Sequence, residues 1–144
     1  MTEPSVIRLR DRLAPGAGPA GPIDLATLVG SWRNYDPASG GLVAIDIDQR
    51  AGDGDGTAAS LVVPAFGGKP AGPVDWGEVA GAGFAAGVGG REAVGFTAGY
   101  DLGFVDVLLA AYLNKRLLVV DSYARFRPDD RRSPYFQRDH FYLP

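Results

Sequence analysis

Short segments of alternating apolar and polar residues, separated by turn-forming residues at fairly regular intervals, follow one another from residue 23 onward. Alternation with period two is typical of strands with one buried face, and such spacing of short strands is typical of all-β sandwiches and barrels. A brief helical turn over 25–28, which Asp24 can cap, precedes them. The pattern predicts eight strands, which begin at Gly30 and then cover 42–48, 58–66, 76–86, 92–100, 104–113, 116–126 and 135–143.

Two turns in the second half of the chain indicate which strand face points inward. A two-residue turn at 114–115 pairs Leu109 with Val120 and leaves one face of that hairpin wholly apolar or small. A two-residue turn at 101–102 brings the apolar residues of the preceding strand to the same face. Because two independent turns agree, we interpret this face as the interior of a barrel.

Large and small side chains mix on this interior face, as they do at Phe96, Ala98 and Tyr100. Small side chains on a barrel interior leave volume that large ones do not fill, so we expect a cavity. Its occupant would be a small, largely apolar organic molecule. The residues expected to bind this ligand are Trp32, Phe96, Tyr100, Val107, Leu109, Ala111, Ser122, Ala124, Phe126 and Tyr142.

The opposite face of the same strands carries more apolar residues than a solvated face needs. A contiguous apolar surface on a soluble protein is typical of an interaction site. We therefore expect a homo-oligomer, with coverage by the N-terminal residues of the same chain as the alternative. The apolar stripe consists of Leu108, Tyr112, Leu117 and Val119.

Composition divides the chain into an arm and one domain. The chain has 144 residues, with 21 glycines and 11 prolines. They make up about a fifth of it, which favours many turns over long helices. Residues 14–22 consist of Ala, Gly and Pro and cannot bury apolar surface, so we interpret residues 1–22 as a flexible N-terminal arm and linker. Residues 23–144 then form one compact β-barrel domain.

The residue types that are scarce restrict the available chemistry. With no cysteine and a single histidine, His140, the chain has neither a cysteine-based nor a multi-histidine metal site, and we expect no cofactor. The formal net charge is −3, and five arginines gather in residues 125–144. Because the rest of the domain is acidic, nucleic acid is not an expected partner. Without a long apolar run or a signal-like N-terminus, we expect no membrane partner and a cytoplasmic location.

A family resemblance rests on three short motifs. They are Gly-Ser-Trp at 30–32, Asp-Trp-Gly-Glu at 75–78 and Asp-Asp-Arg-Arg-Ser at 129–133. Placed in an eight-strand pattern, they resemble the calycin superfamily, which includes lipocalins, fatty-acid-binding proteins and avidins, and more narrowly a bacterial lipocalin-like group. The resemblance implies an eight-stranded up-and-down antiparallel barrel that holds a small molecule, with Arg138 packed across Trp32 at the barrel's closed end.

The last predicted strand carries the polar side chains best suited to catalysis. Period two places Arg138, His140 and Tyr142 on one face. If that face points inward, the cavity gains an imidazole that can carry protons and a guanidinium that can hold a carboxylate or an enolate. The opposite orientation places the row outside, and period two does not decide between them. The candidate catalytic residues are His140, Arg138 and Tyr100.

Three functions are compatible with this pattern. The first is a barrel that binds a small, largely apolar organic molecule. The second is a cofactor-free cyclase or isomerase of specialised metabolism, which would hold a reactive substrate near its attack geometry in the same cavity. The third is a protein-interaction module with a filled core. A filled interior predicts no ligand, whereas a cavity with polar groups favours the enzyme and one without them favours a carrier.

Overall fold

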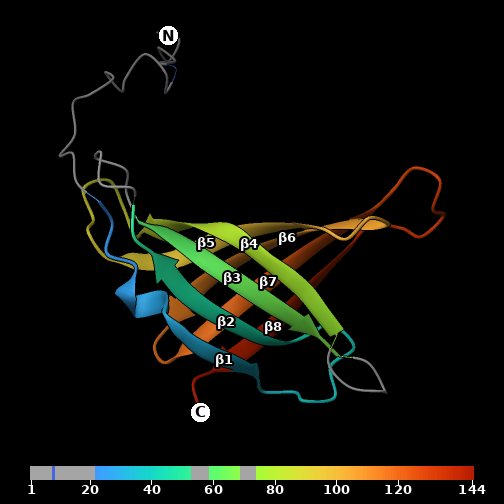
Figure 1. The fold of residues 1–144 in the computed structure, drawn as a ribbon, viewed down its shortest axis with the longest axis horizontal. Helices are drawn as coiled ribbons and strands as arrows, with labels where there is room; N and C mark the ends of the chain where they lie inside the picture. Colours follow the sequence, from blue (N-terminus) through green and yellow to red (C-terminus); the bar gives the residue numbers. More distant parts are fainter. Residues whose placement is uncertain (1–7, 9–21, 53–58, 69–73) are drawn as a thin grey trace, which may run out of the picture.

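The computed structural model describes residue 8 and residues 22–52, 59–68 and 74–144. Within them, eight antiparallel strands join in sequence order and close into one barrel after a turn of 3-10 helix (Figure 1). The predicted all-β class and up-and-down antiparallel barrel are confirmed. The elements are η1 (Ala26–Leu28), β1 (Gly30–Asn34), β2 (Leu42–Arg50), β3 (Ser60–Gly67), β4 (Val74–Ala85), β5 (Ala93–Asp101), β6 (Val105–Asn114), β7 (Leu117–Phe126) and β8 (Tyr135–Tyr142).

The burial of β6 shows the period-two pattern on which the strand prediction rests. Val105, Val107 and Leu109 are buried, whereas the intervening Leu108 is 46% exposed. Burying such alternate side chains removes apolar area from water and is the main favourable contribution to folding. Inward residues of this kind form one hydrophobic core inside the barrel.

The turn between β6 and β7 lies one residue later than predicted. It consists of Lys115 and Arg116, and Lys115 adopts a left-handed φ of 58°. Leu109 therefore pairs with Ser122, and the predicted pairing with Val120 is wrong. A turn that lies one residue later changes the register between β6 and β7 by two residues. Because strand side chains alternate with period two, a register change of two residues keeps each side chain on its own face. The predicted inward face is correct for this reason.

The connection between β5 and β6 is longer than the predicted two-residue turn. Asp101 pairs with Asp106, and the Leu102 N–H donates to the Val105 carbonyl at 3.0 Å. Gly103 has a φ of 89°, a conformation that glycine adopts without the strain of a side chain. The predicted turn is therefore wrong. The register between β5 and β6 again differs from the predicted one by an even number of residues, so each side chain keeps its predicted face.

One end of the barrel is closed by η1 and the start of β1. Leu28 is fully buried, and its carbonyl accepts a hydrogen bond from Trp32 Nε1 at 3.0 Å. The Thr27 hydroxyl donates to the Ala93 carbonyl at 2.6 Å, which ties η1 to the start of β5. Trp32, which is 2% exposed, thus fills this end with its only polar side-chain group satisfied.

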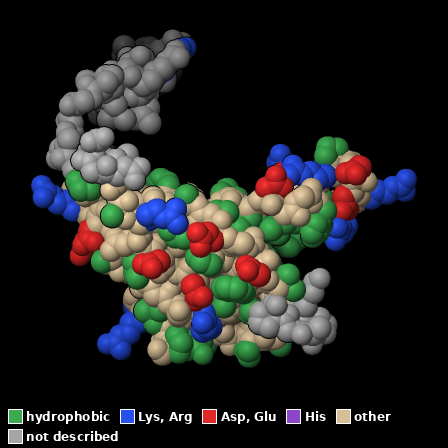
Figure 2. Space-filling view, viewed as in Figure 1, with side chains coloured by type: hydrophobic (Ala, Val, Ile, Leu, Met, Phe, Trp, Pro, Cys, Tyr) green, Lys and Arg blue, Asp and Glu red, His purple; other side chains and the backbone are tan. Residues whose placement is uncertain are grey.

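The β1–β2, β5–β6 and β7–β8 connections lie at the other end of the barrel. The β7–β8 connection projects at the upper right of Figure 1, and Figure 2 shows acidic and basic side chains mixed on it. We call this end the mouth of the barrel.

The predicted arm and linker, residues 1–22, lie outside the described residues except for positions 8 and 22. The domain boundary at residue 23 therefore stays a prediction. Among the described residues, no helix has the length and apolar character needed to cross a membrane.

Candidate functional site

The open end of the barrel contains a pocket of about 380 Å³. Trp76 of β4, Val105 and Val107 of β6, Phe126 of β7 and Tyr135 of β8 line it. Each belongs to the part of its strand nearest the mouth. Pockets that bind organic ligands typically have volumes of roughly 300–1,000 Å³ and mainly apolar walls. This pocket satisfies the volume criterion, and its walls combine apolar side chains with the charged side chains of Asp75 and Arg132.

Trp76 forms one wall of the pocket and depends on a neighbouring glycine. A Cβ atom at Gly67 would lie 2.5 Å from Trp76 Nε1, so a side chain there would displace the indole. The indole packs edge-on against Tyr100, with ring centroids 5.8 Å apart. Tyr100 donates its hydroxyl hydrogen to the Val63 carbonyl, and burial raises the pKa of its phenol. The phenol is therefore neutral and already bonded where it supports this wall.

An arginine lies over a second, aromatic wall. The centroid of the Phe126 ring is 6.5 Å from that of Phe104 and 6.1 Å from that of Tyr135. The Arg132 Cζ is 4.2 Å from the Phe126 centroid and 5.4 Å from the Phe104 centroid, within the range of cation–π attraction. Hydrogen bonds from Arg132 lower the pKa of Asp130 to about 2, so this carboxylate stays ionised as its counter-ion.

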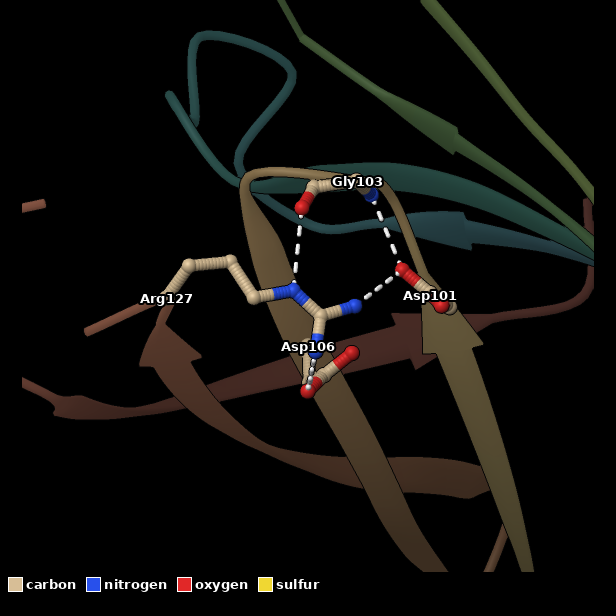
Figure 3. A network of polar contacts seen from close by, with 4 residues as sticks. All are labelled: Asp101, Gly103, Asp106 and Arg127. Atoms are coloured by element: carbon tan, nitrogen blue, oxygen red, sulfur yellow. Dashed lines mark hydrogen bonds and ion pairs between the residues drawn. The ribbon is translucent and has the colours of Figure 1, made fainter. Parts of the chain in front are cut away.

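An ion-pair network holds the β5–β6 connection beside the pocket (Figure 3). Arg127 Nη1 binds Asp106 Oδ2 at 3.0 Å, Nη2 binds Asp101 Oδ1, and Nε donates to the Gly103 carbonyl at 2.9 Å. The Gly103 N–H and then Arg127 lower the pKa of Asp101. Each exposed ion pair contributes little stability by itself. Together these contacts fix the position of the connection that supplies pocket residues.

The structure places the predicted lining residues in different parts of the barrel. Val107 and Phe126 line the pocket, Tyr100 supports its Trp76 wall, and Trp32 lies at the closed end. The pocket is therefore nearer the mouth than the predicted cavity. The remaining inward residues, which are buried and do not line this pocket, are Phe96, Leu109, Ala111, Ser122 and Ala124.

The polar row of β8 faces outward. Arg138 binds Asp121 across the strand pair, with Nε–Oδ1 2.7 Å and Nη2–Oδ2 3.0 Å, and exposed His140 lies on the same face. Phe141, at the alternate position, is fully buried. Arg138 therefore does not pack across Trp32, and this implication of the calycin resemblance is wrong. The orientation that period two leaves open is decided in favour of the outward row.

Tyr142 also lies outside the barrel, where its ring centroid is 4.7 Å from that of Tyr35. It shares the outer face with Arg138 and His140, whereas Tyr100 is buried inside. The structure thus does not bring the three candidate catalytic residues together. Within the described residues, no cluster of three or more His, Cys, Asp or Glu side chains could hold a metal ion.

Of the described residues that line the pocket, only Val107 and Phe126 belong to the predicted set, and the absent ones include Trp76, Leu102 and Arg132. The position of Trp76 near the start of a predicted strand is a signal that could have placed it at the mouth. Leu102 and Arg132 lie in connections, where alternation assigns no face. Their place in the pocket wall therefore depends on how the connections fold, which the sequence pattern does not predict.

Comparison with known proteins finds no matching family model, curated protein or solved structure. The eight-stranded barrel is compatible with a calycin-like fold. Its function is therefore argued from the geometry of the pocket.

Proposed function

We propose that the protein binds a small, largely apolar organic molecule in the pocket at the mouth of its barrel, in keeping with its resemblance to the calycins. The observation that carries this proposal is the pocket of about 380 Å³ between the Trp76 wall and the Phe126 wall. Trp32 fills the closed end of the barrel, and Leu109 is fully buried in its interior. A ligand would therefore enter from the mouth. Burial of apolar ligand surface against these rings would supply most of the affinity.

Titration with an apolar fluorescent probe, N-phenyl-1-naphthylamine, tests the proposal. We expect its emission to rise and to shift to shorter wavelength as it enters the pocket. Val107→Phe should fill the space and weaken binding at least about tenfold, the equivalent of roughly 1.4 kcal/mol. Val88→Phe is the matched control, because it makes the same change at a residue of the β4–β5 connection that is exposed and lines neither the mouth pocket nor the outer groove. Circular dichroism of both variants establishes that the barrel is intact.

Two outcomes would contradict the proposal. One is a wild-type protein that leaves the probe emission unchanged at high protein concentration. The other is a folded Val107→Phe protein that binds the probe as tightly as Val88→Phe does.

A second candidate function, protein interaction, is favoured by the outer face. Gly99, Leu108, Tyr123 and Phe136 line a groove of about 770 Å³ across β5–β8. Leu108, Tyr123 and Phe136 are each roughly half exposed. An aromatic surface of this kind is typical of interaction sites. The groove and the mouth pocket are adjacent, because Val107 and Tyr135 line both.

A further inference from the structure

The mouth pocket combines aromatic and aliphatic side chains with the guanidinium of Arg132. Among the residues that the structure describes, Arg132 is the one basic residue that lines the pocket. Its guanidinium stacks on the Phe126 ring, and Asp130 holds one of its edges, with Nε–Oδ1 3.0 Å and Nη2–Oδ2 2.7 Å. A long side chain that is stacked and paired in this way loses little further freedom when it binds a ligand.

The other edge of the guanidinium remains available. Within the described residues, Arg132 donates hydrogen bonds through Nε and Nη2 to Asp130 and to no other side chain, and Nη1 donates none. Arginine has five donor hydrogens in a planar fork, so a second acceptor can bind at the edge that Asp130 leaves. Planar acidic groups, such as carboxylates and enolates, match this fork.

Asp75 is the carboxylate among the described residues that line the pocket. Asp75 Oδ1 accepts a hydrogen bond from the Gly77 N–H at 2.7 Å, which turns it toward its own strand. Trp76, Val107 and Phe126 supply the apolar surface beside it. The pocket therefore suits a molecule with an apolar body and one acidic group at the end that meets Arg132.

We infer that the ligand of the mouth pocket is such an amphipathic acid, and that Arg132 receives its carboxylate or enolate. This inference rests on the proposed binding function and specifies its ligand class. Arg132 acts as a specificity residue: it selects the acid over a neutral molecule of the same shape. Asp130 acts as a positioning residue, because it orients the guanidinium without meeting the ligand.

Calorimetric titration of naphthalene-2-carboxylate and of its methyl ester tests the inference, because both share one apolar body and differ in charge. We expect the wild-type protein to bind the carboxylate about tenfold more tightly than the ester, as one charge-assisted hydrogen bond would provide. Arg132→Gln should reduce this ratio to about one while the affinity for the ester changes little. Arg131→Gln, the neighbouring exposed arginine that does not line the pocket, should retain the ratio.

The outcomes separate the inference from the function on which it rests. Equal affinities of the wild-type protein for acid and ester would overturn the role of Arg132 and leave apolar binding intact. A ratio that survives in Arg132→Gln would also overturn it. If neither compound nor the apolar probe binds, the proposed function itself is wrong. Because the ester reports the state of the apolar walls in every variant, a collapsed pocket is distinguished from a lost contact.

Discussion

Leu108 and Leu109 are neighbours with opposite surroundings. Leu109 is fully buried inside the barrel, whereas Leu108 is on its outer face. Truncation of Leu109 to alanine removes apolar contacts and leaves a cavity, so Leu109→Ala should lower the free energy of unfolding by about 2–5 kcal/mol. Leu108→Ala should change it by only about 0.5 kcal/mol. Urea unfolding of both variants measures the difference, and a larger loss in Leu108→Ala would contradict the assigned interior.

The pair Asp121–Arg138 predicts a pH dependence of stability. The hydrogen bonds that Arg138 donates to Asp121 lower the pKa of this carboxyl group below its ordinary value of 3.8. The folded protein therefore holds this proton less tightly than the unfolded chain does. The stabilisation is present above about the ordinary pKa and is lost as the pH falls through the lower, folded pKa.

Asp121→Asn should accordingly be less stable than wild type by about 1 kcal/mol at neutral pH, since one partner of the pair is half exposed. The difference should shrink as the pH falls below 3.8. Urea unfolding at a series of pH values measures it. A stability difference that stays constant down to strongly acidic pH would show that Asp121 does not titrate in this way.

Two glycines of β5 differ in what surrounds them. A Cβ at Gly95 would lie 2.4 Å from the Ala111 carbonyl oxygen of β6, whereas a Cβ at Gly99 would meet nothing within 4 Å. Gly95→Ala should therefore force the two strands apart and destabilise the barrel by roughly 1–3 kcal/mol. Gly99→Ala, the matched control, should be neutral or stabilising by up to about 1 kcal/mol. Thermal unfolding followed by circular dichroism compares them, and equal losses would contradict the close approach.

The strands were predictable from sequence because each alternation is local. β6 was expected over 104–113 and spans Val105–Asn114. The turns were harder, because a shift by an even number of residues preserves every hydrophobic face and so leaves no trace in the pattern. Lys115 with its left-handed φ is also not the residue type that signals such a turn. Local alternation therefore determines faces better than registers.

The pocket was only partly predictable for a different reason. Interior positions such as Val107 and Phe126 follow from alternation, and both line it. Which interior volume remains empty depends on how large side chains from distant strands meet, as the Trp76 indole beside Gly67 shows. Arg132 reaches Phe126 from a connection, and no periodic pattern contains that contact.

The outer face predicts association of whole molecules. Of the predicted stripe, Leu108 and Tyr112 are exposed, but Val119 is 2% exposed and is already covered within one chain. Tyr123 and Phe136 extend the exposed part across β7 and β8. We expect this surface to join two or more copies of the chain, because burial of these rings removes a large apolar area from water.

Light scattering at concentrations well above micromolar should report an oligomer for the wild-type protein. Leu108→Glu combined with Tyr123→Glu should yield a monomer, because each would bury an unpaired charge at the interface. Val88→Glu is the control, since this exposed residue lies in the β4–β5 connection, at the other end of the barrel from the mouth. A wild-type monomer would contradict association through this face.

The closure of the barrel has a consequence for the order in which the chain folds. β1 and β8 pair through Arg33 with Tyr142 and Asn34 with Phe141, whereas every other pairing in the described sheet joins consecutive strands. Contacts between distant parts of a chain form slowly, because the entropy of closing a long loop is lost before these contacts contribute any favourable free energy. We therefore expect the meander from β2 to β7 to assemble hairpin by hairpin, and the joining of β1 to β8 to complete the native state last. Weakening that junction should accelerate unfolding much more than it slows folding.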